Sequence, residues 1–372
     1  MNIKLTNIIL CFLLVVVCLK GEEAQISLDN LDAFFLKGVD NKIYTKTDFN
    51  GENGNLIVFL SNHCKISQLF QISLISNYEK WKNNGIKLFC ISPNYELSIL
   101  PDELAYSNLG DSFQEMKLRA IEQKYNFPFL YDGEKQVLTN QLNVKITPCA
   151  FLFDKFDRLI YFGKIGDIDK LNTFQNSVLS QKIEALIDGK NLKFSRTKLY
   201  GTRVKFEKDI KIAQDVAYRY SREKIRISFT DERRLNFFIE QKTDYPKLFY
   251  FWTMNDNEEL NRENLITISK YFKIFRKRGF KVFTVCVGEE EKKDEMVEVL
   301  EKAQLSAINL YTSGTELTKA SHLRPPIGNF TTPFTRLVSG SGAKLYGTVG
   351  AVNAIMLRNS ILQSLNDADH RQ

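Results

Sequence analysis

Cysteine is the residue type in this sequence that is best suited to chemistry. The chain has six cysteines and three histidines in 372 residues. Two of the cysteines fall in an apolar run near the N-terminus, which leaves Cys64, Cys90, Cys149 and Cys286. No pair of them has the spacing of zinc ligands, and four cysteines are too few to build a fold on disulfides. We therefore expect any chemistry to come from individual thiols, with no metal and no cofactor.

Cys64 is the strongest candidate nucleophile. The apolar run 56–60 predicts a buried strand, and from Lys65 onward apolar residues recur at helical spacing. Cys64 should then lie at the N-terminus of a helix, where free N–H groups and the helix dipole stabilise a thiolate. His63 and Lys65 add positive potential beside it. Two interpretations stay open: a reactive thiol, or a buried and inert cysteine.

The elements around Cys64 follow an order that occurs twice along the chain. This order is strand, loop, helix, strand, Thr-Pro, hairpin and helix. In the first half, its strands, Thr-Pro pair, hairpin and last helix fall at 56–60, 86–91, 147–148, 150–163 and 171–187. In the second half, they fall at 247–252, 282–287, 332–333, 334–347 and 352–365. We predict an α/β protein of two tandem domains, each a central mixed sheet flanked by helices, with a boundary in the charged stretch 190–226.

The order of elements is similar to the thioredoxin fold. The first copy resembles the redoxins of the alkyl hydroperoxide reductase/thiol-specific antioxidant group, in the subgroup with an Asn-His-Cys-Pro motif. The matching stretches are 35–40, 58–64, 111–117, 127–132, 147–154 and 183–189. The second copy resembles only the general thioredoxin outline. The resemblance implies a redoxin domain over 24–205, a linker or the start of the second domain over 206–226, and a degenerate thioredoxin-like domain over 227–372.

The resemblance also implies roles for residues near Cys64. His63 belongs to the motif itself. Thr147 and Pro148 match the cis-proline loop, which faces the active-site cysteine in this fold. Ser61 stands where peroxiredoxins place a threonine that hydrogen-bonds the thiolate and the peroxide. We therefore take Cys64, Ser61, His63, Thr147 and Pro148 as the candidate catalytic residues.

The sequence departs from the family's pattern at several positions. Lys65 replaces the proline that usually follows the motif cysteine, and Ile57 replaces the proline that precedes the peroxiredoxin threonine. Ser67 stands where thioredoxins carry the second cysteine of Cys-x-x-Cys. Thr202 stands where the subgroup often has a further cysteine. The chain therefore has no partner thiol in either place.

The other cysteines have structural interpretations. Cys149 follows the Thr-Pro pair, so it either forms a disulfide with Cys64 or points into the sheet core, and we favour the core. Cys90 and Cys286 lie inside apolar strands and are expected to act as small core hydrophobes.

The loop of the second copy that corresponds to the Cys64 loop contains no cysteine, which excludes thiol chemistry there. Its carboxylates Asp256, Glu258 and Glu259 are either acid/base or cation-binding groups, or simply acidic residues favoured by the helix dipole. We favour the second interpretation.

We thus expect a thiol oxidoreductase that reduces a peroxide or a protein disulfide, with Cys64 as sole nucleophile and an external thiol as reductant. The alternative is a non-catalytic module that binds peptides or proteins through its cis-proline loops. The net charge of +7 is spread along the chain without an arginine-rich block, so we expect no nucleic-acid partner.

The N-terminal apolar run 8–19 is about the length of a signal-peptide core and shorter than a bilayer span. We expect a signal peptide over 1–21, a periplasmic or extracellular protein of the secretory pathway, and no stable membrane insertion after cleavage. An uncleaved anchor and a lipoprotein modified at Cys18 are the alternatives, and the bulk of Val17 disfavours the latter.

The first prediction concerns this processing. In the native host, the mature N-terminus should lie near Glu22, because the charged and polar residues that follow the apolar run mark the end of the leader. Intact-mass measurement of the protein from that host checks it. A full-length mass together with retention in the membrane fraction would favour the anchor.

Overall fold

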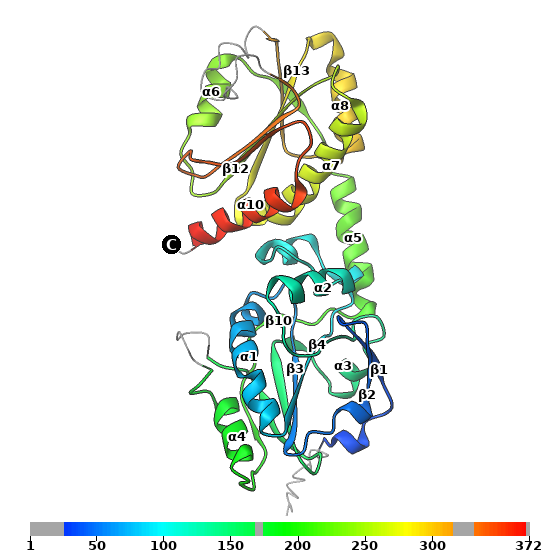
Figure 1. Ribbon diagram of the computed structural model, residues 1–372. Coiled ribbons are helices and arrows are strands. Elements are labelled where there is room, and N and C mark those ends of the chain that lie inside the picture. The colour runs from blue at the N-terminus through cyan, green and yellow to red at the C-terminus, as the bar shows by residue number, and fades with distance from the viewer. Residues whose placement is uncertain (1–25, 168–173, 315–330, 370–372) are drawn as a thin grey trace, which may run out of the picture.

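The computed structural model describes residues 26–167, 174–314 and 331–369. The expected signal peptide and the first residues of the helix expected at 171–187 lie outside the described residues. The described residues form two α/β lobes, one from each half of the sequence (Figure 1). Among the described helices, none is both long enough and apolar enough to cross a bilayer.

The first lobe is built on an eight-stranded mixed sheet in the order β2-β1-β5-β4-β3-β7-β8-β9. Parallel pairing joins β3, β4 and β5, whereas β7 runs antiparallel to both β3 and β8. The strands are β1 (Phe35–Gly38), β2 (Ile43–Thr45), β3 (Gly54–Phe59), β4 (Ile86–Ser92), β5 (Phe129–Tyr131), β7 (Cys149–Asp154), β8 (Leu159–Gly163) and β9 (Ser195–Arg196). A separate two-stranded ribbon pairs β6 (Ile146–Thr147) with β10 (Thr202–Arg203).

Helices cover both faces of this sheet because its central strands are apolar on both sides. In β3, Leu56 and Val58 pack into the core on one face, and Ile57 and Phe59 pack into the core on the other. The first core also receives side chains from α1 (Lys65–Asn83), α2 (Phe113–Glu122) and α4 (Val178–Ile187), and the second from α3 (Val137–Gln141).

The second lobe repeats this plan with a six-stranded mixed sheet in the order β11-β14-β13-β12-β15-β16. Its strands are β11 (Ile227–Phe229), β12 (Lys247–Thr253), β13 (Lys281–Val287), β14 (Ile308–Thr312), β15 (Phe334–Val338) and β16 (Lys344–Val349). Its helices are α6 (Glu232–Glu240), α7 (Glu258–Phe275), α8 (Lys293–Lys302) and α10 (Ala354–Asp369). As in the first lobe, β12 and β13 are parallel, while β15 runs antiparallel to β12 and β16. The predicted fold class, α/β with two mixed sheets flanked by helices, is confirmed.

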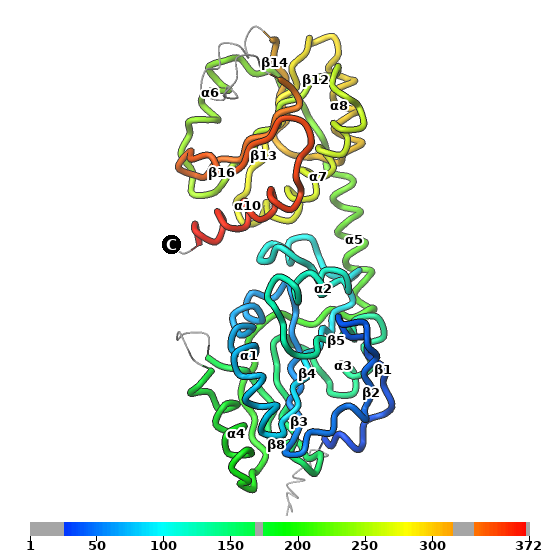
Figure 2. The backbone as a smooth tube through the Cα atoms, in the orientation of Figure 1, coloured from blue at the N-terminus to red at the C-terminus, as the bar shows by residue number. Residues whose placement is uncertain are grey.

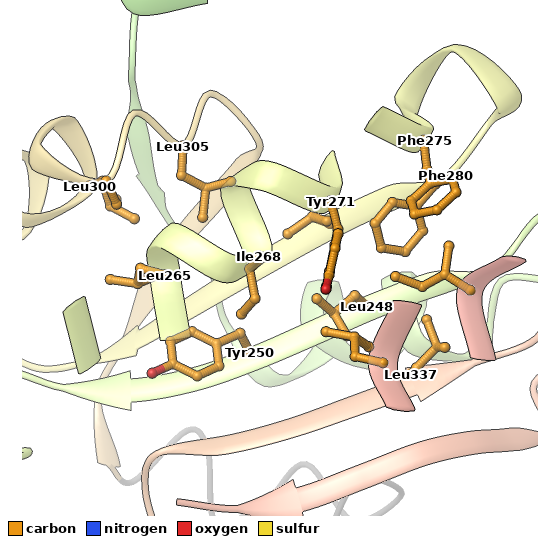
Figure 3. Packing of buried hydrophobic residues seen from close by; sticks show 14 of the residues in the cluster. Leu248, Tyr250, Leu265, Ile268, Tyr271, Phe275, Phe280, Leu300, Leu305 and Leu337 are labelled. Atoms are coloured by element: carbon orange, nitrogen blue, oxygen red, sulfur yellow. The ribbon is translucent and has the colours of Figure 1, made fainter. Parts of the chain in front are cut away.

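The largest core lies between the second sheet and α7, α8 and α10. Leu248 and Tyr250 of β12 meet Leu265, Ile268 and Tyr271 of α7 there, as Figure 3 shows. The alternate residues of β12 point to the opposite face and pack under α6. The same two-sided burial that defines β3 therefore defines β12.

The segment between the two sheets is more structured than the sequence indicated. The stretch 206–226, expected as a linker or the start of the second domain, contains the helix α5 (Ile210–Ser221). This helix runs along one side of the molecule from the first lobe to the second (Figure 2). Elements β11 and α6 follow it before the strand predicted at 247–252.

A short segment of the first lobe docks against the second. It is the 3-10 helix η4 (Pro101–Tyr106), whose Ala105 is buried in the large core of the second lobe. The Arg278 guanidinium donates to the Ala105 carbonyl at 2.6 Å, and Arg358 donates to the Ser107 carbonyl at 2.8 Å. Lys277 pairs with Asp102 at 2.5 Å. The lobes therefore meet through buried contacts as well as through α5.

Candidate active site

Cys64 is the residue that precedes the first turn of α1, as the sequence predicted. Its backbone carbonyl accepts the first hydrogen bond of the helix, from the Gln68 N–H at 3.2 Å. The loop Ser61–Cys64 is itself a turn, closed by a bond of 3.3 Å from the Cys64 N–H to the Ser61 carbonyl. The helix ends at Asn83, and Gly85 follows with φ +72°. A strand that ends in a tight turn and enters a helix thus places the thiol at a helix N-terminus.

The structure brings Cys64 together with the Thr147–Pro148 loop. The Thr147–Pro148 peptide bond is cis, and the Cys64 Sγ–H donates to the Thr147 carbonyl oxygen at 3.2 Å. The two residues are 83 positions apart in sequence. Their contact is possible because β3 and β7 are neighbours in the sheet, with Phe59 paired to Cys149.

The thiol is covered in this arrangement, since Cys64 is only 1% exposed. Strand β10 lies against the Thr147 side of the loop, with Thr202 opposite Thr147. Gly201, at φ +153°, approaches so closely that a Cβ there would overlap the Thr147 carbonyl oxygen. A glycine is therefore required where the chain passes over this loop.

A buried carboxylate, Asp111, organises the loop that carries Cys64. Its oxygens accept hydrogen bonds from the Ser61 Oγ at 2.8 Å, the Asn62 N–H at 2.5 Å, the His63 Nδ1 at 2.7 Å and the Asn94 Nδ2 at 2.6 Å. Asp111 is 1% exposed. These groups come from the loop after β3, the loop after β4 and the entry to α2, which all lie at the carboxyl edge of the parallel strands.

Sequence reasoning did not identify Asp111 or Asn94 as site residues. Asp111 was part of a stretch that matched the redoxin family, next to the helix cap Ser112, but nothing local marked its long-range role. One signal in the sequence could have pointed to the site. Polar residues follow each of the two adjacent parallel strands β3 and β4, and loops at the carboxyl ends of such strands converge at one edge of the sheet.

The His63–Asp111 pair sets the electrostatics of the loop. Burial alone would lower the pKa of His63, but the charge of Asp111 and its hydrogen bond outweigh burial and hold that pKa above its usual 6.5. For Asp111, burial acts to raise the pKa, and the bonds and charge from His63, Ser61 and Asn94 outweigh it and lower the pKa below 3.8. The positive potential expected from His63 is thus largely balanced by Asp111.

The Ser61 hydroxyl makes a different contact from the one that the family resemblance implied. It donates to Asp111 and lies 3.0 Å from the His63 Nδ1, while the partner of the Cys64 thiol is the Thr147 carbonyl. Ser61 therefore supports the histidine–carboxylate pair in this structure.

A cavity of about 520 Å³ opens beside the Cys64 loop, between the two lobes. His63, Lys65 and Gly201 line it from the first lobe, and Lys277 and Arg278 line it from the second. The His63 Nε2 is buried without a hydrogen-bond partner among the described residues. Because Nδ1 is held by Asp111, Nε2 is the ring nitrogen left available for a ligand or a proton transfer.

The remaining cysteines lie in the cores. Cys64, Cys90, Cys149 and Cys286 are all free and buried, so the disulfide between Cys64 and Cys149 is not formed. Cys149 packs in the second core of the first sheet, as favoured from the sequence. Burial raises the pKa of Cys90 and of Cys149, and burial together with the charge of Asp256 raises that of Cys286 to about 12.

The second lobe has the same loop geometry without a thiol. Its Thr332–Pro333 bond is also cis. Asp256 connects the loop after β12 to this turn, accepting the Thr332 hydroxyl at 2.7 Å and the Thr253 N–H at 2.7 Å. Glu258 and Glu259 lie in the first turn of α7. Within the described residues, no three His, Cys, Asp or Glu side chains come together as a metal site would require.

The topology and the site define the first half of the chain as a thioredoxin-like domain. Its parallel β3 and β4, antiparallel β7 and β8, cysteine at the start of α1 and facing cis-proline are the features of that fold. No family model matches the sequence, and no curated protein matches it.

Several solved structures are similar to a part of this chain that amounts to about half of it or less. They include a hypothetical protein of Sinorhizobium meliloti (22% identity, covering 49% of this chain and 93% of that chain, TM-score 0.42). An uncharacterized conserved protein of Geobacillus kaustophilus is similar at 23% identity, 49% and 92% coverage and TM-score 0.43. A secreted disulfide oxidoreductase of Mycobacterium tuberculosis is similar at 14% identity, 41% and 95% coverage and TM-score 0.30.

The second prediction concerns the buried pair. Asp111→Asn removes the charge that opposes burial, so the pKa of His63 should fall below 6.5. Ring-proton NMR titration measures it, with His63→Gln assigning the signal among the three histidines. Asp188→Asn, at an exposed pair with Lys190, is the control and should leave the titration unchanged.

The same pair makes stability depend on pH. Since the pKa of His63 is raised in the fold, its contribution is complete below pH 6.5 and is lost as the pH rises through the raised value. The contribution of Asp111 is present above pH 3.8 and is lost as the pH falls through its lowered pKa. In urea unfolding curves of Asp111→Asn, the Asp111 dependence should disappear and the His63 dependence should reverse sign, because burial alone lowers the pKa of His63 and stability then falls as the pH drops below 6.5. A wild-type pH profile in that variant would contradict the pairing.

Proposed function

We propose that the chain is a thiol oxidoreductase that reduces a small peroxide, with Cys64 as its sole nucleophile. The observation that carries this proposal is the placement of Cys64 at the N-terminus of α1, facing the cis Thr147–Pro148 loop. The resemblance of the first copy to the Asn-His-Cys redoxin subgroup supports the same chemistry. One of the similar structures is described as a disulfide oxidoreductase, which agrees with a thiol reaction in general.

The cover over Cys64 favours a small oxidant over a protein disulfide. An extended peptide would pair with the backbone edge of the cis-proline loop, and the chain's own strand β10 occupies that edge at Thr147. Cys64 is 1% exposed, so a folded protein disulfide has no direct approach to its sulfur. The same observation disfavours the alternative of a peptide-binding module at the first loop. A peroxide is small enough to need only a slight opening beside Gly201.

The reaction that we propose has two steps. The Cys64 thiolate attacks one peroxide oxygen, which forms an S–O bond and breaks the O–O bond. The sulfur is oxidised to a sulfenic acid, and the leaving oxygen takes a proton and departs as water or an alcohol. Two equivalents of an external thiol then return the sulfenic acid to the thiol, releasing water and a disulfide of the external thiol.

In this proposal, His63 supplies the proton. It lines the cavity beside the Cys64 loop, and its Nε2 is unpartnered. Asp111 holds Nδ1 and raises the pKa of the ring, so that the protonated form persists to higher pH. Lys65, exposed at the first residue of α1, adds positive charge at the cavity wall. We place the reaction in the periplasm or outside the cell, in line with the leader expected at residues 1–21.

The third prediction tests the nucleophile. Hydrogen peroxide near equimolar amounts should oxidise Cys64 well before the other three cysteines, because only Cys64 lies at a helix N-terminus outside the sheet cores. Unfolding in urea with dimedone, followed by peptide mass spectrometry, reports the sulfenic acid at each site. Cys64→Ser should abolish the adduct and thiol-dependent peroxide consumption, while Cys286→Ser should change neither. Equal oxidation of all four thiols would overturn the proposal.

The fourth prediction concerns Ser67, which stands where thioredoxins carry the second cysteine of their Cys-x-x-Cys motif. Ser67 lies one helical turn after Cys64 and is buried, with its Oγ accepting from the Ser61 N–H at 3.2 Å. Ser67→Cys restores the Cys-x-x-Cys spacing, so peroxide should now give an intramolecular disulfide with Cys64 in place of the sulfenic acid. Non-reducing peptide mapping detects it.

The matched control adds an exposed thiol farther along the same helix. Ser76→Cys lies three turns from Cys64 and cannot reach it, so the sulfenic acid should persist in that variant. If Ser67→Cys gives no disulfide while Cys64 still forms the sulfenic acid, the first turn of α1 is not arranged as described here.

A further inference from the structure

A cavity with no role in the proposed thiol chemistry lies beside β7 and β8 of the first lobe. It has a volume of about 840 Å³, within the range of small-molecule pockets. Phe151 of β7 and Leu159 and Phe162 of β8 line it, and the segment 194–199 forms another wall. It shares no lining residue with the cavity beside the Cys64 loop. The two sites can therefore be tested separately.

Polar and apolar side chains both line this cavity, and several of the apolar ones lie on strands of the first lobe. The rings of Phe151 and Phe162 lie 4.6 Å apart, and Phe151 is buried against the sheet core. Leu142 and Ile146, from the chain just before the cis-proline loop, add further aliphatic surface. The walls belong to sheet strands and to residues packed on them, so the apolar surface does not have to be assembled when a ligand binds.

All of the charged residues that line the cavity are basic. Lys145, Arg196 and Lys198 all line the cavity, and its lining contains no acidic residue. None of the three forms an ion pair with a carboxylate of the described residues. Each lies near an aromatic ring instead; the Arg196 guanidinium, for example, is 5.2 Å from the centre of the Phe162 ring. Three unpaired cations around an apolar pocket are complementary to a ligand with an apolar body and an anionic head.

We infer that this cavity binds a long-chain fatty acid. The acyl chain lies along Ile146, Phe162 and Phe194, apolar lining residues that keep exposed surface, where its burial supplies the affinity. The carboxylate lies at the open side, where Arg196 and the two lysines can donate charge-assisted hydrogen bonds. A neutral lipid would leave the three cations without an anionic partner, and a small polar anion would leave the apolar walls uncovered. The occupant that uses both features is an amphipathic monoanion.

Binding of oleate to the purified chain tests this inference, with calorimetry as the measurement. Oleate should bind at least about tenfold more tightly than oleyl alcohol, which has the same chain without the charge. The triple variant Lys145→Ala, Arg196→Ala, Lys198→Ala should lose that difference while retaining its fold, because all three side chains are exposed. The matched control replaces three exposed cations of the other half, Lys224, Arg226 and Lys292, and should bind oleate like the unmodified chain.

A second measurement locates the ligand. A photoreactive fatty acid should label peptides that contain β8 or residues 194–199, and excess oleate should suppress the labelling. Equal affinity for oleate and oleyl alcohol, unchanged oleate binding by the triple variant, or labelling elsewhere would overturn the inference. It would also be overturned if an acidic, hydrophobic peptide bound at this surface and oleate did not. Loss of peroxide chemistry in Cys64→Ser has no bearing on any of these outcomes.

Discussion

The burial of the Asp111 carboxylate is the constraint on which the candidate site depends. A charge in this position is tolerated only when its oxygens are fully paired, and removing one partner of a buried ion pair typically costs about 3–5 kcal/mol. Asp111 meets this requirement with donors from Ser61, Asn62, His63 and Asn94. These donors belong to the loops that follow β3 and β4. One side chain therefore fixes the path of the loop that delivers Cys64 to the start of α1.

This arrangement also determines what His63 can do. A histidine whose Nδ1 is bound to a carboxylate has a defined orientation and one free nitrogen. Here that nitrogen is buried, and His63 lines a cavity that the second lobe completes. Arg278 closes the cavity on that side while donating to the Ala105 carbonyl of η4. The second lobe, although it has no thiol in its own loop, thus contributes to the surroundings of the thiol in the first.

The sequence was sufficient to predict the elements whose signals are local. The apolar run before Cys64 and the helical spacing after Lys65 predicted the helix-capping thiol, and the resemblance to the thioredoxin fold implied the cis-proline turns at the two Thr-Pro pairs. The start of α2 is an equally local feature, because the Ser112 Oγ accepts the N–H of Glu115 at 3.3 Å. In each case the residues that carry the signal are within a few positions of the feature.

The parts that could not be predicted depend on contacts between distant residues. Asp111 lies 48 positions from His63, and β10 pairs with Thr147 across more than 50 residues. Helix α5 contacts the 3-10 helix η3 (Glu96–Ser98) of the first lobe, and its Tyr220 ring lies 4.3 Å from the Arg276 guanidinium of the second, whereas in the sequence α5 is part of a charged stretch. Strand β10 and Gly201 pass over the loop that faces Cys64. The burial of Cys64 could therefore not be predicted without the path of the chain after α4.

The comparison of the two lobes shows what the fold itself requires at the position of the thiol. In each lobe, the loop that enters the first long helix is tied to the cis-proline turn by one hydrogen bond. In the first lobe, the Cys64 thiol donates to the Thr147 carbonyl; in the second, the Asp256 carboxylate accepts from the Thr332 hydroxyl. The second lobe closes this contact without sulfur, so the architecture does not impose a cysteine there. The fold can therefore form without a cysteine at this position. This is our reason for proposing a chemical role for Cys64.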